Sequence, residues 1–380
     1  TEASSKGAIT WGSGTSGISG VVSSSNSLVG STAGDAVGYG AVGTGIGINT
    51  LSNGNAVIAS PMWGSGNGTT ANAKGAVTWI NGSTPLTPGT LDSSNSLVGG
   101  TTGDRVGSGP VIELSNGNYI VRSSYWGGGA SATSATSKGA LTWGSGTTGI
   151  SGVVSSSTSL VGGAAGDNVG SGGISILNNG NAVAVHPVWS SGDGTSLNAK
   201  GAVTWIDGFR GITGVLGSSN SLVGSVAGDR VGAVGSVTVL SNGNYFVRSS
   251  YWGGGASGTV ASSKGAITWG SGTLGVIGEV SSSNSLVGSA AGDNVGSSAG
   301  TALLSNGNAV VLSPLWGSGD GTAANAKGAM TWINGATGLT GTLDASNSLV
   351  GSAAGDNVGS GTVTALNNGN AVDRKSTRLN

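Results

Sequence analysis

The chain has 380 residues, of which 78 are glycine, 6 are proline and none is cysteine, and its charged residues make up 8% against 36% hydrophobic residues. Glycine without a Gly-X-Y period excludes collagen, and high hydrophobicity with few charges excludes an intrinsically disordered chain. The net charge of -1 without basic clusters predicts no nucleic-acid partner, and no apolar run is long enough to span a membrane.

Short sequences recur along the chain at a spacing of about 63 residues, and such a period is typical of repeat architectures. Each complete unit contains a Gly-Asp step, an NGN tripeptide, a KGA tripeptide and a Thr-Trp step. We interpret residues 1–372 as one repeat array. Its units start near the aspartates of the Gly-Asp steps, after a partial first unit over residues 1–34, at Asp35, Asp104, Asp167, Asp229, Asp293 and Asp356.

The elements of one unit can be taken in chain order. Residues 236–240 (SVTVL) predict a strand, and residues 245–252 (YFVRSSYW) predict a second strand, joined by an Asn-Gly step. Asn-Gly favours a type I′ hairpin turn. Residues 265–269 (GAITW) and 284–288 (NSLVG) predict a third and a fourth strand, and helical periodicity is absent. Four strands per unit match the size of a propeller blade.

The predicted fold class is therefore all-β, a β-propeller of about six four-stranded blades, or the same blades within a seven-bladed ring or a longer array. The alternative is a right-handed β-solenoid, because the NSLVG, NGN and KGA anchors fall about 20–22 residues apart, as three rungs would. The Asn-Gly hairpin favours the propeller, since it requires antiparallel pairing while solenoid rungs stack in parallel.

A longer period lies over the first one. Odd units read SYWGGGAS and TWGSGT, whereas even units read PxWxSGxGT and TWI followed by Asn-Gly or Asp-Gly. The duplicated unit is therefore a pair of about 126 residues, which points to expansion by duplication and to a module that stacks on its neighbours.

The stretch from Ser221 to Trp252, which reads SLVGSVAGDRVGAVGSVTVLSNGNYFVRSSYW and continues to KGAITW, resembles the FG-GAP type of β-propeller repeat. It is also similar to uncharacterised repeats of large filamentous-haemagglutinin-type bacterial surface proteins. The resemblance implies a propeller and an extracellular or cell-surface location. FG-GAP blades of integrins carry calcium loops with several acidic residues, whereas SGDGT at Asp193 and Asp320 offers one carboxylate each. We expect no metal and no cofactor.

The sequence carries no set of residues typical of an enzyme. His186 is the only histidine, and serine stands at the same position in sister units, at Ser60 and Ser313. A catalytic triad needs a histidine oriented by a carboxylate, in one unique site. The aspartates instead recur once per unit, which favours turn capping or pairing with the KGA lysine. We expect no catalytic residues and no enzyme activity.

The candidate ligand contacts are an arginine and two aromatic residues that recur in the odd units. Residues of these types are common in interaction hot spots, although the same residues also serve packing between blades. The set comprises Arg122, Tyr125, Trp126, Arg248, Tyr251 and Trp252.

These observations predict a structural and adhesive repeat scaffold of a large secreted bacterial surface protein, without catalysis. The alternative is a ligand-binding propeller module, lectin-like or integrin-like, whose partner is a glycan or a protein surface. Residues 373–380 (DRKSTRLN) share nothing with the repeats, and we interpret them as a non-native read-through tail.

Overall fold

The computed structural model describes residues 4–40, 47–130, 132–233, 235–255, 258–297 and 301–373. Their regular structure is almost entirely β-strand, so the all-β prediction is confirmed, and a turn of 3-10 helix, η2, covers Thr70–Asn72. The chain divides into two compact units. Unit 1 contains residues 1–171, 192–194 and 207–216, and unit 2 contains residues 172–191, 195–206 and 217–380.

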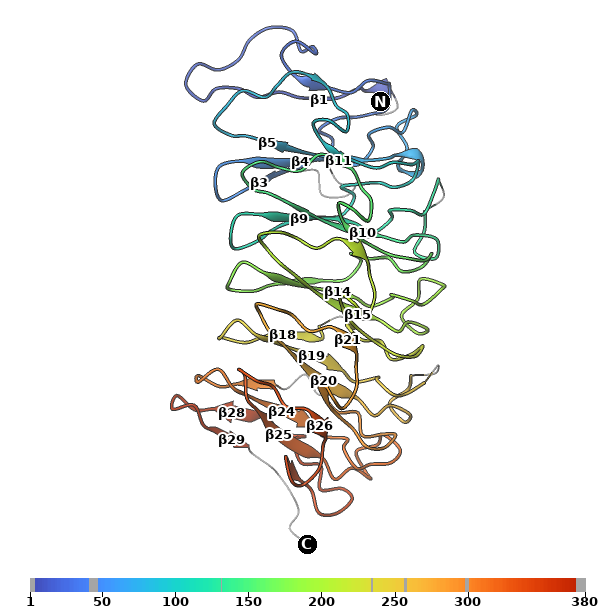
Figure 1. Cartoon of the computed structure of the whole chain (residues 1–380), viewed down its shortest axis with the longest axis vertical. Coiled ribbons are helices and arrows are strands. Elements are labelled where there is room, and N and C mark those ends of the chain that lie inside the picture. The colour runs from blue at the N-terminus through green and yellow to red at the C-terminus, as the bar shows by residue number, and fades with distance from the viewer. Residues whose placement is uncertain are drawn as a thin grey trace. The chain divides into compact units, whose positions relative to one another are not determined.

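Each complete repeat forms one antiparallel sheet of four strands, as predicted. In unit 1, β3 (Ile48–Thr50), β4 (Ala56–Ser60), β5 (Ala76–Ile80) and β7 (Leu97–Val98) pair antiparallel in chain order (Figure 1). A fifth strand was not predicted. It is β11 (Gly152–Val153), which belongs to the following repeat and pairs in parallel with β7. This sheet is therefore completed by a strand of the following repeat.

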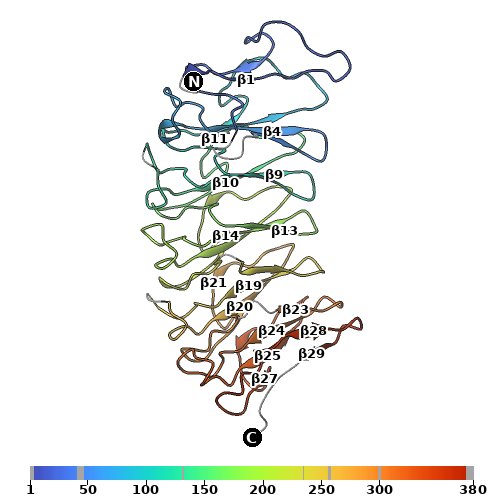
Figure 2. The ribbon, with the colours of Figure 1, turned by 180° about the vertical axis from the view of Figure 1, so that it is seen from behind.

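The other sheets repeat this order. Unit 1 also holds a three-stranded sheet of β1 (Ala8–Ile9), β2 (Leu28–Val29) and β6 (Gly89–Thr90), and a five-stranded sheet of β8 (Val111–Glu113), β9 (Tyr119–Ser123), β10 (Ala140–Gly144), β12 (Leu160–Val161) and β16 (Gly214–Val215). Figure 2 shows this unit from behind.

Unit 2 has four sheets. The first contains five strands: β13 (Ile174–Ile176), β14 (Ala182–His186), β15 (Ala202–Ile206), β17 (Leu222–Val223) and β21 (Gly278–Glu279). The second also contains five: β18 (Val237–Val239), β19 (Tyr245–Ser249), β20 (Ala266–Gly270), β22 (Ser285–Val287) and β26 (Gly341–Thr342). The last two are formed by β23 (Thr301–Leu303), β24 (Ala309–Ser313), β25 (Ala329–Ile333) and β27 (Leu349–Val350), and by β28 (Val363–Ala365) and β29 (Ala371–Asp373).

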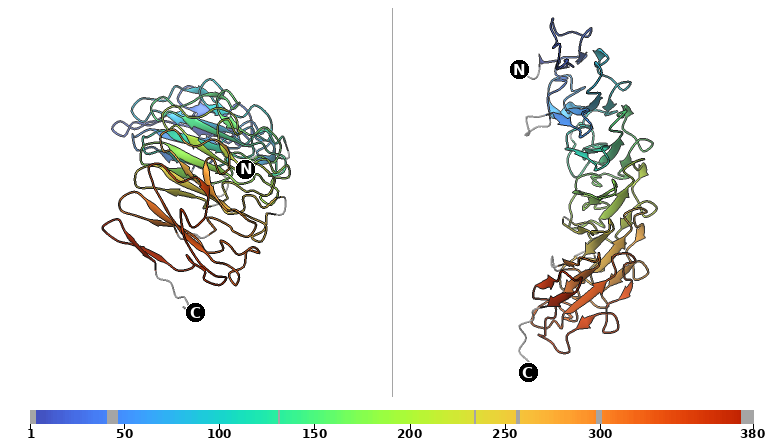
Figure 3. Two further views of the ribbon diagram at one scale, coloured as in Figure 1. Left: turned by 60° about the horizontal axis from the view of Figure 1, so that its bottom comes forward. Right: turned by 90° about the vertical axis from the view of Figure 1, so that its left-hand side faces the viewer.

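Within each unit, successive sheets follow one another as layers (Figure 3). The main strands of every repeat pair antiparallel, as the hairpin predicted, which differs from the parallel pairing of solenoid rungs. The described strands do not form a closed ring of blades within either unit, so the propeller form stays a prediction. No helix in the described part of the chain is long and apolar enough to cross a membrane.

The Asn-Gly hairpin is confirmed, but its turn type is not. In unit 2, Val239 and Tyr245 form the last strand pair, and Gly243 N donates to Leu240 O at 3.0 Å. Gly243 has φ +86°, whereas Asn242 is not among the residues with positive φ. A type I′ turn requires positive φ at both positions, so the loop is a type I turn followed by a glycine bulge. The side chain of Asn242 is then available for bonds to the next repeat.

The hydrophobic core lies between consecutive sheets. In unit 1, Val57, Val77 and Leu97 of one sheet form a buried cluster with Val121 and Val161 of the next. Side chains of a strand alternate between its two faces, so an interior sheet must bury both. A single repeat cannot supply both covers, and its stability therefore depends on its neighbours.

The alternation of odd and even units in the sequence follows from how side chains of different size pack across each sheet. In odd units a tyrosine faces a glycine across the sheet, as Tyr119 pairs with Gly144, and a Cβ at this glycine would overlap the tyrosine ring. In even units the sizes are reversed, as Ala56 pairs with Ile80. The same alternation recurs in unit 2 at Tyr245 and Gly270, Ala182 and Ile206, and Ala309 and Ile333.

The predicted read-through tail falls mostly outside the described residues. Asp373 is the last residue of β29 and pairs with Val363 of β28. Residues 374–380 lie beyond the part of the chain that the structure describes.

Candidate functional site

At four junctions between described repeats, a backbone carbonyl collects three N–H donors from the preceding repeat. In unit 1, Gly146 O accepts Asn53 Nδ2 at 2.8 Å, Asn55 Nδ2 at 2.7 Å and Trp79 Nε1 at 3.1 Å. We call this arrangement the junction node. Gly208 O in unit 1 and Gly272 O and Gly335 O in unit 2 accept the equivalent donors. The NGN asparagines and the Thr-Trp tryptophans therefore hold repeats together.

A glycine lies against the tryptophan of each node. Gly149 has φ +73°, and a Cβ there would lie 2.6 Å from Cβ of Trp79. Since any larger residue would push the indole away, the glycine is required by close approach. Three further pairs repeat this contact: Gly211 with Trp143, Gly275 with Trp205, and Gly338 with Trp269.

The recurring aspartates cap turns, as predicted. Asp104 is 2% exposed, and its carboxylate accepts Thr101 N at 2.8 Å, Thr101 Oγ1 at 3.0 Å and Gly127 N at 3.0 Å. The last bond joins the Gly-Asp turn to the loop after Trp126. Asp35, Asp229 and Asp293 have the equivalent partners. The hydrogen bonds of each carboxylate hold the Gly-Asp turn against the loop after the tryptophan, which is a structural role.

His186 lies in the core of unit 2, on β14, and is 0% exposed. Its Nε2 lies 3.1 Å from Thr204 Oγ1, which lies 2.6 Å from Ser221 Oγ. The same Thr–Ser pair recurs in repeats without histidine, as Thr142 and Ser159. The histidine therefore joins a hydroxyl pair that the fold already contains, at a position closed to solvent.

The predicted ligand contacts are not one exposed cluster. Arg122 donates from Nε to Gly170 O at 2.7 Å and from Nη2 to Ser171 O at 3.0 Å, and burial lowers its pKa. Trp126 packs against the core of unit 1, and Trp252 against that of unit 2. Arg248 donates from Nη2 to Gly235 O at 2.6 Å. These arginines and tryptophans therefore serve packing and backbone bonding.

Tyr125 and Tyr251 have a partner that sequence reasoning missed. The guanidinium carbon of Arg105 lies 4.8 Å from the centre of the Tyr125 ring, and that of Arg230 lies 4.5 Å from the Tyr251 ring. Both arginines follow the aspartate of a Gly-Asp step, where the other units have Ala36, Asn168, Asn294 or Asn357. Arginine thus stands at this position in the two units that have tyrosine before tryptophan, which is the signal that could have identified the pair.

A pocket of about 290 Å³ adjoins this arginine in unit 1. Its lining comes from two consecutive repeats: Pro61 and Thr70 from one, and Arg105, Ser108 and Tyr125 from the next. We call it the arginine pocket. Ser108 Oγ is buried and has no hydrogen-bond partner among the described residues.

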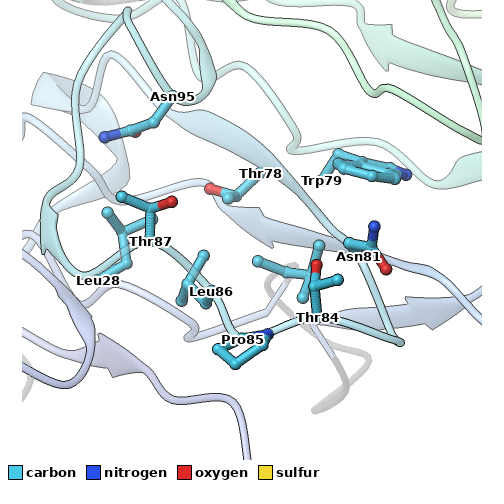
Figure 4. A pocket seen from close by; sticks show the side chains of 10 residues that line it. Leu28, Thr78, Trp79, Asn81, Thr84, Pro85, Leu86, Thr87 and Asn95 are labelled. Atoms are coloured by element: carbon cyan, nitrogen blue, oxygen red, sulfur yellow. The ribbon is translucent and has the colours of Figure 1, made fainter.

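A second pocket in unit 1, of about 280 Å³, lies beside a loop that is unlike those of the other repeats. Figure 4 shows Thr84, Pro85, Leu86 and Thr87 along one side and Thr78 and Trp79 on strand β5. We call it the loop pocket. Thr84 and Thr87 are exposed, and Nδ2 of Asn81 has no partner among the described residues, while its Oδ1 accepts Ser83 N at 2.8 Å. The lining is neutral, with amide, hydroxyl and indole groups.

No group of three or more His, Cys, Asp or Glu side chains in the described ranges could hold a metal ion. Asp320, in one of the SGDGT loops, accepts Thr322 N at 2.9 Å, Thr322 Oγ1 at 2.8 Å and Asn325 Nδ2 at 2.6 Å. These bonds, that of the Thr322 hydroxyl first, lower the pKa of Asp320. The carboxylate caps its own loop.

A family model described as "Repeat of unknown function (DUF5650)" matches residues 1–39, 50–108, 113–171, 176–233, 239–297 and 303–360. No curated protein sequence matches the chain.

The solved structures that match the chain are distant. The chain is 11% identical to a virginiamycin B lyase from Staphylococcus aureus, with a TM-score of 0.30 over 77% of this chain and 67% of that one. It is also 11% identical to a streptogramin B lyase, with a TM-score of 0.31 over 87% of this chain and 83% of that one. It is 10% identical to an ulvan lyase of family PL25, solved with a bound saccharide, with a TM-score of 0.28 over 83% of this chain and 74% of that one.

Proposed function

The chain belongs to the family of repeats of unknown function (DUF5650), and we propose that its repeats form a structural and adhesive scaffold of a large secreted bacterial surface protein, without catalysis. In this proposal the sheets are propeller-type blades that resemble FG-GAP repeats. The chain would be exported and would act at or beyond the cell surface. Its role would be to extend and present the protein rather than to convert a substrate.

The observation that carries the proposal is the junction node. The residues that recur most regularly, the NGN asparagines and the Thr-Trp tryptophans, donate to a carbonyl of the next repeat. A node of this kind adds one more interface with every added repeat, so stability grows with copy number. That property suits a scaffold whose length can change by duplication.

Cell-surface labelling tests the proposal. Antibodies raised against the 380-residue chain should label intact, unpermeabilised cells of the source organism, and mild protease treatment of those cells should remove the signal. Labelling that appears only after permeabilisation would contradict the surface role. Hydrolase or lyase activity of the purified chain that is lost on His186→Ser, the residue of the sister repeats, would contradict the absence of catalysis.

A second candidate function is a ligand-binding propeller module, lectin-like or integrin-like, and the loop pocket favours it. The half-buried indole of Trp79, the Asn81 Nδ2 that has no partner among the described residues, and the exposed hydroxyls of Thr84 and Thr87 are groups that bind neutral sugars. The pocket depends on a loop with Pro85 and Pro88, whereas the last even repeat has Ala336–Gly341 there.

The chain supplies its own control for this second function. Replacing Ser83–Gly89 by the sequence of Ala336–Gly341 should preserve the fold, because that sequence already closes an equivalent repeat. Binding to a neutral glycan array that is present in the parent chain and lost in the loop-replaced chain would support a lectin-like module. Equal binding by both chains would exclude the loop pocket.

A further inference from the structure

Arg105 and Arg230 occupy a backbone conformation that does not favour arginine. Both have φ +48°, in the left-handed region. Asparagine tolerates this region better than other non-glycine residues, and Asn168 and Asn294 occupy it in sister repeats with φ +44°. A strained residue that the fold could replace with a better one is a reason to look for a function.

The structural task of the position does not require a guanidinium. Asn168 Nδ2 donates to Ser134 O, and Asn294 Nδ2 donates to Val260 O at 2.5 Å, each a carbonyl of the preceding repeat. Arg105 makes the equivalent bond from Nε to Thr70 O at 2.8 Å. Asparagine therefore achieves the same tie between repeats with a shorter side chain.

What arginine adds is a set of free donors. Nη1 and Nη2 of Arg105 have no hydrogen-bond partner in the described part of the chain, and Tyr125 holds the guanidinium in place by stacking. The arginine pocket contains no acidic residue, and Ser108 Oγ is an unpartnered hydroxyl within its wall. The positive charge is thus fixed at a pocket with nothing to neutralise it.

The arrangement occurs again in unit 2. Arg230 stacks on Tyr251, and its Nε is buried without a partner among the described residues. Pro187 and Ser196 stand at the positions equivalent to Pro61 and Thr70, and Ala233 replaces Ser108. The set of arginine, tyrosine and proline therefore has the pair period of the sequence.

We propose that the arginine pocket and its counterpart at Arg230 each bind the oxyanion, carboxylate or sulfate ester, of one residue of an acidic polysaccharide. Two parallel N–H donors of arginine match the two oxygens of such a group. The proline and tyrosine rings provide an apolar wall for a sugar ring, and the hydroxyl of Thr70 can bond to a sugar hydroxyl. A site that recurs along the chain suits a polymer that also repeats. This inference names the ligand class for the adhesive part of the proposed function.

The experiment compares the full chain with the double variant Arg105→Asn/Arg230→Asn, which keeps the residue type of the sister repeats. The probes are polygalacturonate for carboxylate, dextran sulfate for sulfate, neutral dextran, and polyglutamate for an acidic peptide. We expect the parent chain to bind one or both of the acidic polysaccharides and not neutral dextran. The double variant should keep the parent's melting temperature and lose affinity by about tenfold or more, since a charge-assisted bond is lost at each site.

Three outcomes would overturn the inference. The first is an affinity for the acidic polysaccharides that the double variant retains, and the second is no binding by the parent chain. The third is equally tight binding of polyglutamate, which would indicate general attraction of acidic chains rather than a sugar site. Cell-surface labelling does not depend on these residues, so failure here and failure of the scaffold proposal are distinguishable.

Discussion

Packing between the repeats of each unit depends on asparagine and tryptophan side chains and on glycines that contact them. A glycine carbonyl accepts three N–H donors that are partly buried and would otherwise lose hydrogen bonds, and a nearby glycine lets the indole approach the backbone. The sizes of cross-strand partners are matched in the same way. Tyr119 fits because Gly144 has no side chain.

The size match can be tested with a double-mutant cycle. Tyr119→Ala should destabilise the protein by about 3–5 kcal/mol, because it leaves a void, and Gly144→Ile should destabilise it by overlap with the tyrosine ring. The double variant recreates the Ala56–Ile80 pair of the even repeats and should recover most of the loss. Melting temperatures by near-UV circular dichroism measure this. Additive losses in the double variant would refute the packing account.

Burial also makes stability depend on alkaline pH. Desolvation raises the pKa of Tyr119 and of Tyr245 above the ordinary value of 10.0. With a raised pKa in the folded state, the stabilisation is complete below pH 10 and is lost as pH rises above it, because only the unfolded state ionises readily. Between about pH 10 and 12 the melting temperature should fall, and Tyr119→Phe/Tyr245→Phe should flatten that fall. An unchanged slope in the double variant would show that other groups cause it.

Sequence patterns predicted the four strands that a repeat forms itself, but not the fifth strand that the following repeat adds to its sheet. The hairpin, the four strands and the turn-capping aspartates have local signals, namely Asn-Gly, alternating apolar residues and Gly-Asp. Strand β11 has only two residues and begins with a glycine, so it shows no alternation, and its partner β7 lies in another repeat. Arg105 was missed for a related reason, since its ring partner Tyr125 is distant in sequence and its own neighbours read as a turn.

The borrowed strand makes a prediction of its own. Val154 directly follows β11, donates from its N to Val98 O at 3.0 Å and is 3% exposed, whereas Val153 is 44% exposed. Val154→Ala should cost about 2 kcal/mol from lost burial, and Val153→Ala should cost a few tenths. Chemical denaturation of the two variants compares them directly. Equal costs would mean that the borrowed strand does not anchor the preceding sheet.

The whole chain is built by repetition of one kind of junction. The same node, the same glycine contact and the same borrowed strand recur at successive junctions within each unit. Nearest-neighbour coupling of this kind implies that damage at one junction spreads to the repeats on both of its sides and stops there.

Hydrogen exchange of the full chain, compared with its Gly149→Val variant, tests this coupling most directly. Valine at this position adds a Cβ within 2.6 Å of Trp79 Cβ in a backbone conformation with φ +73°. Strands β4 and β5, which precede the junction, and β9 and β10, which follow it, should lose protection together, while the exposed neighbour variant Thr148→Val should leave them unchanged. Loss of protection confined to the turn at residues 145–149 would contradict the claim that each repeat depends on the next.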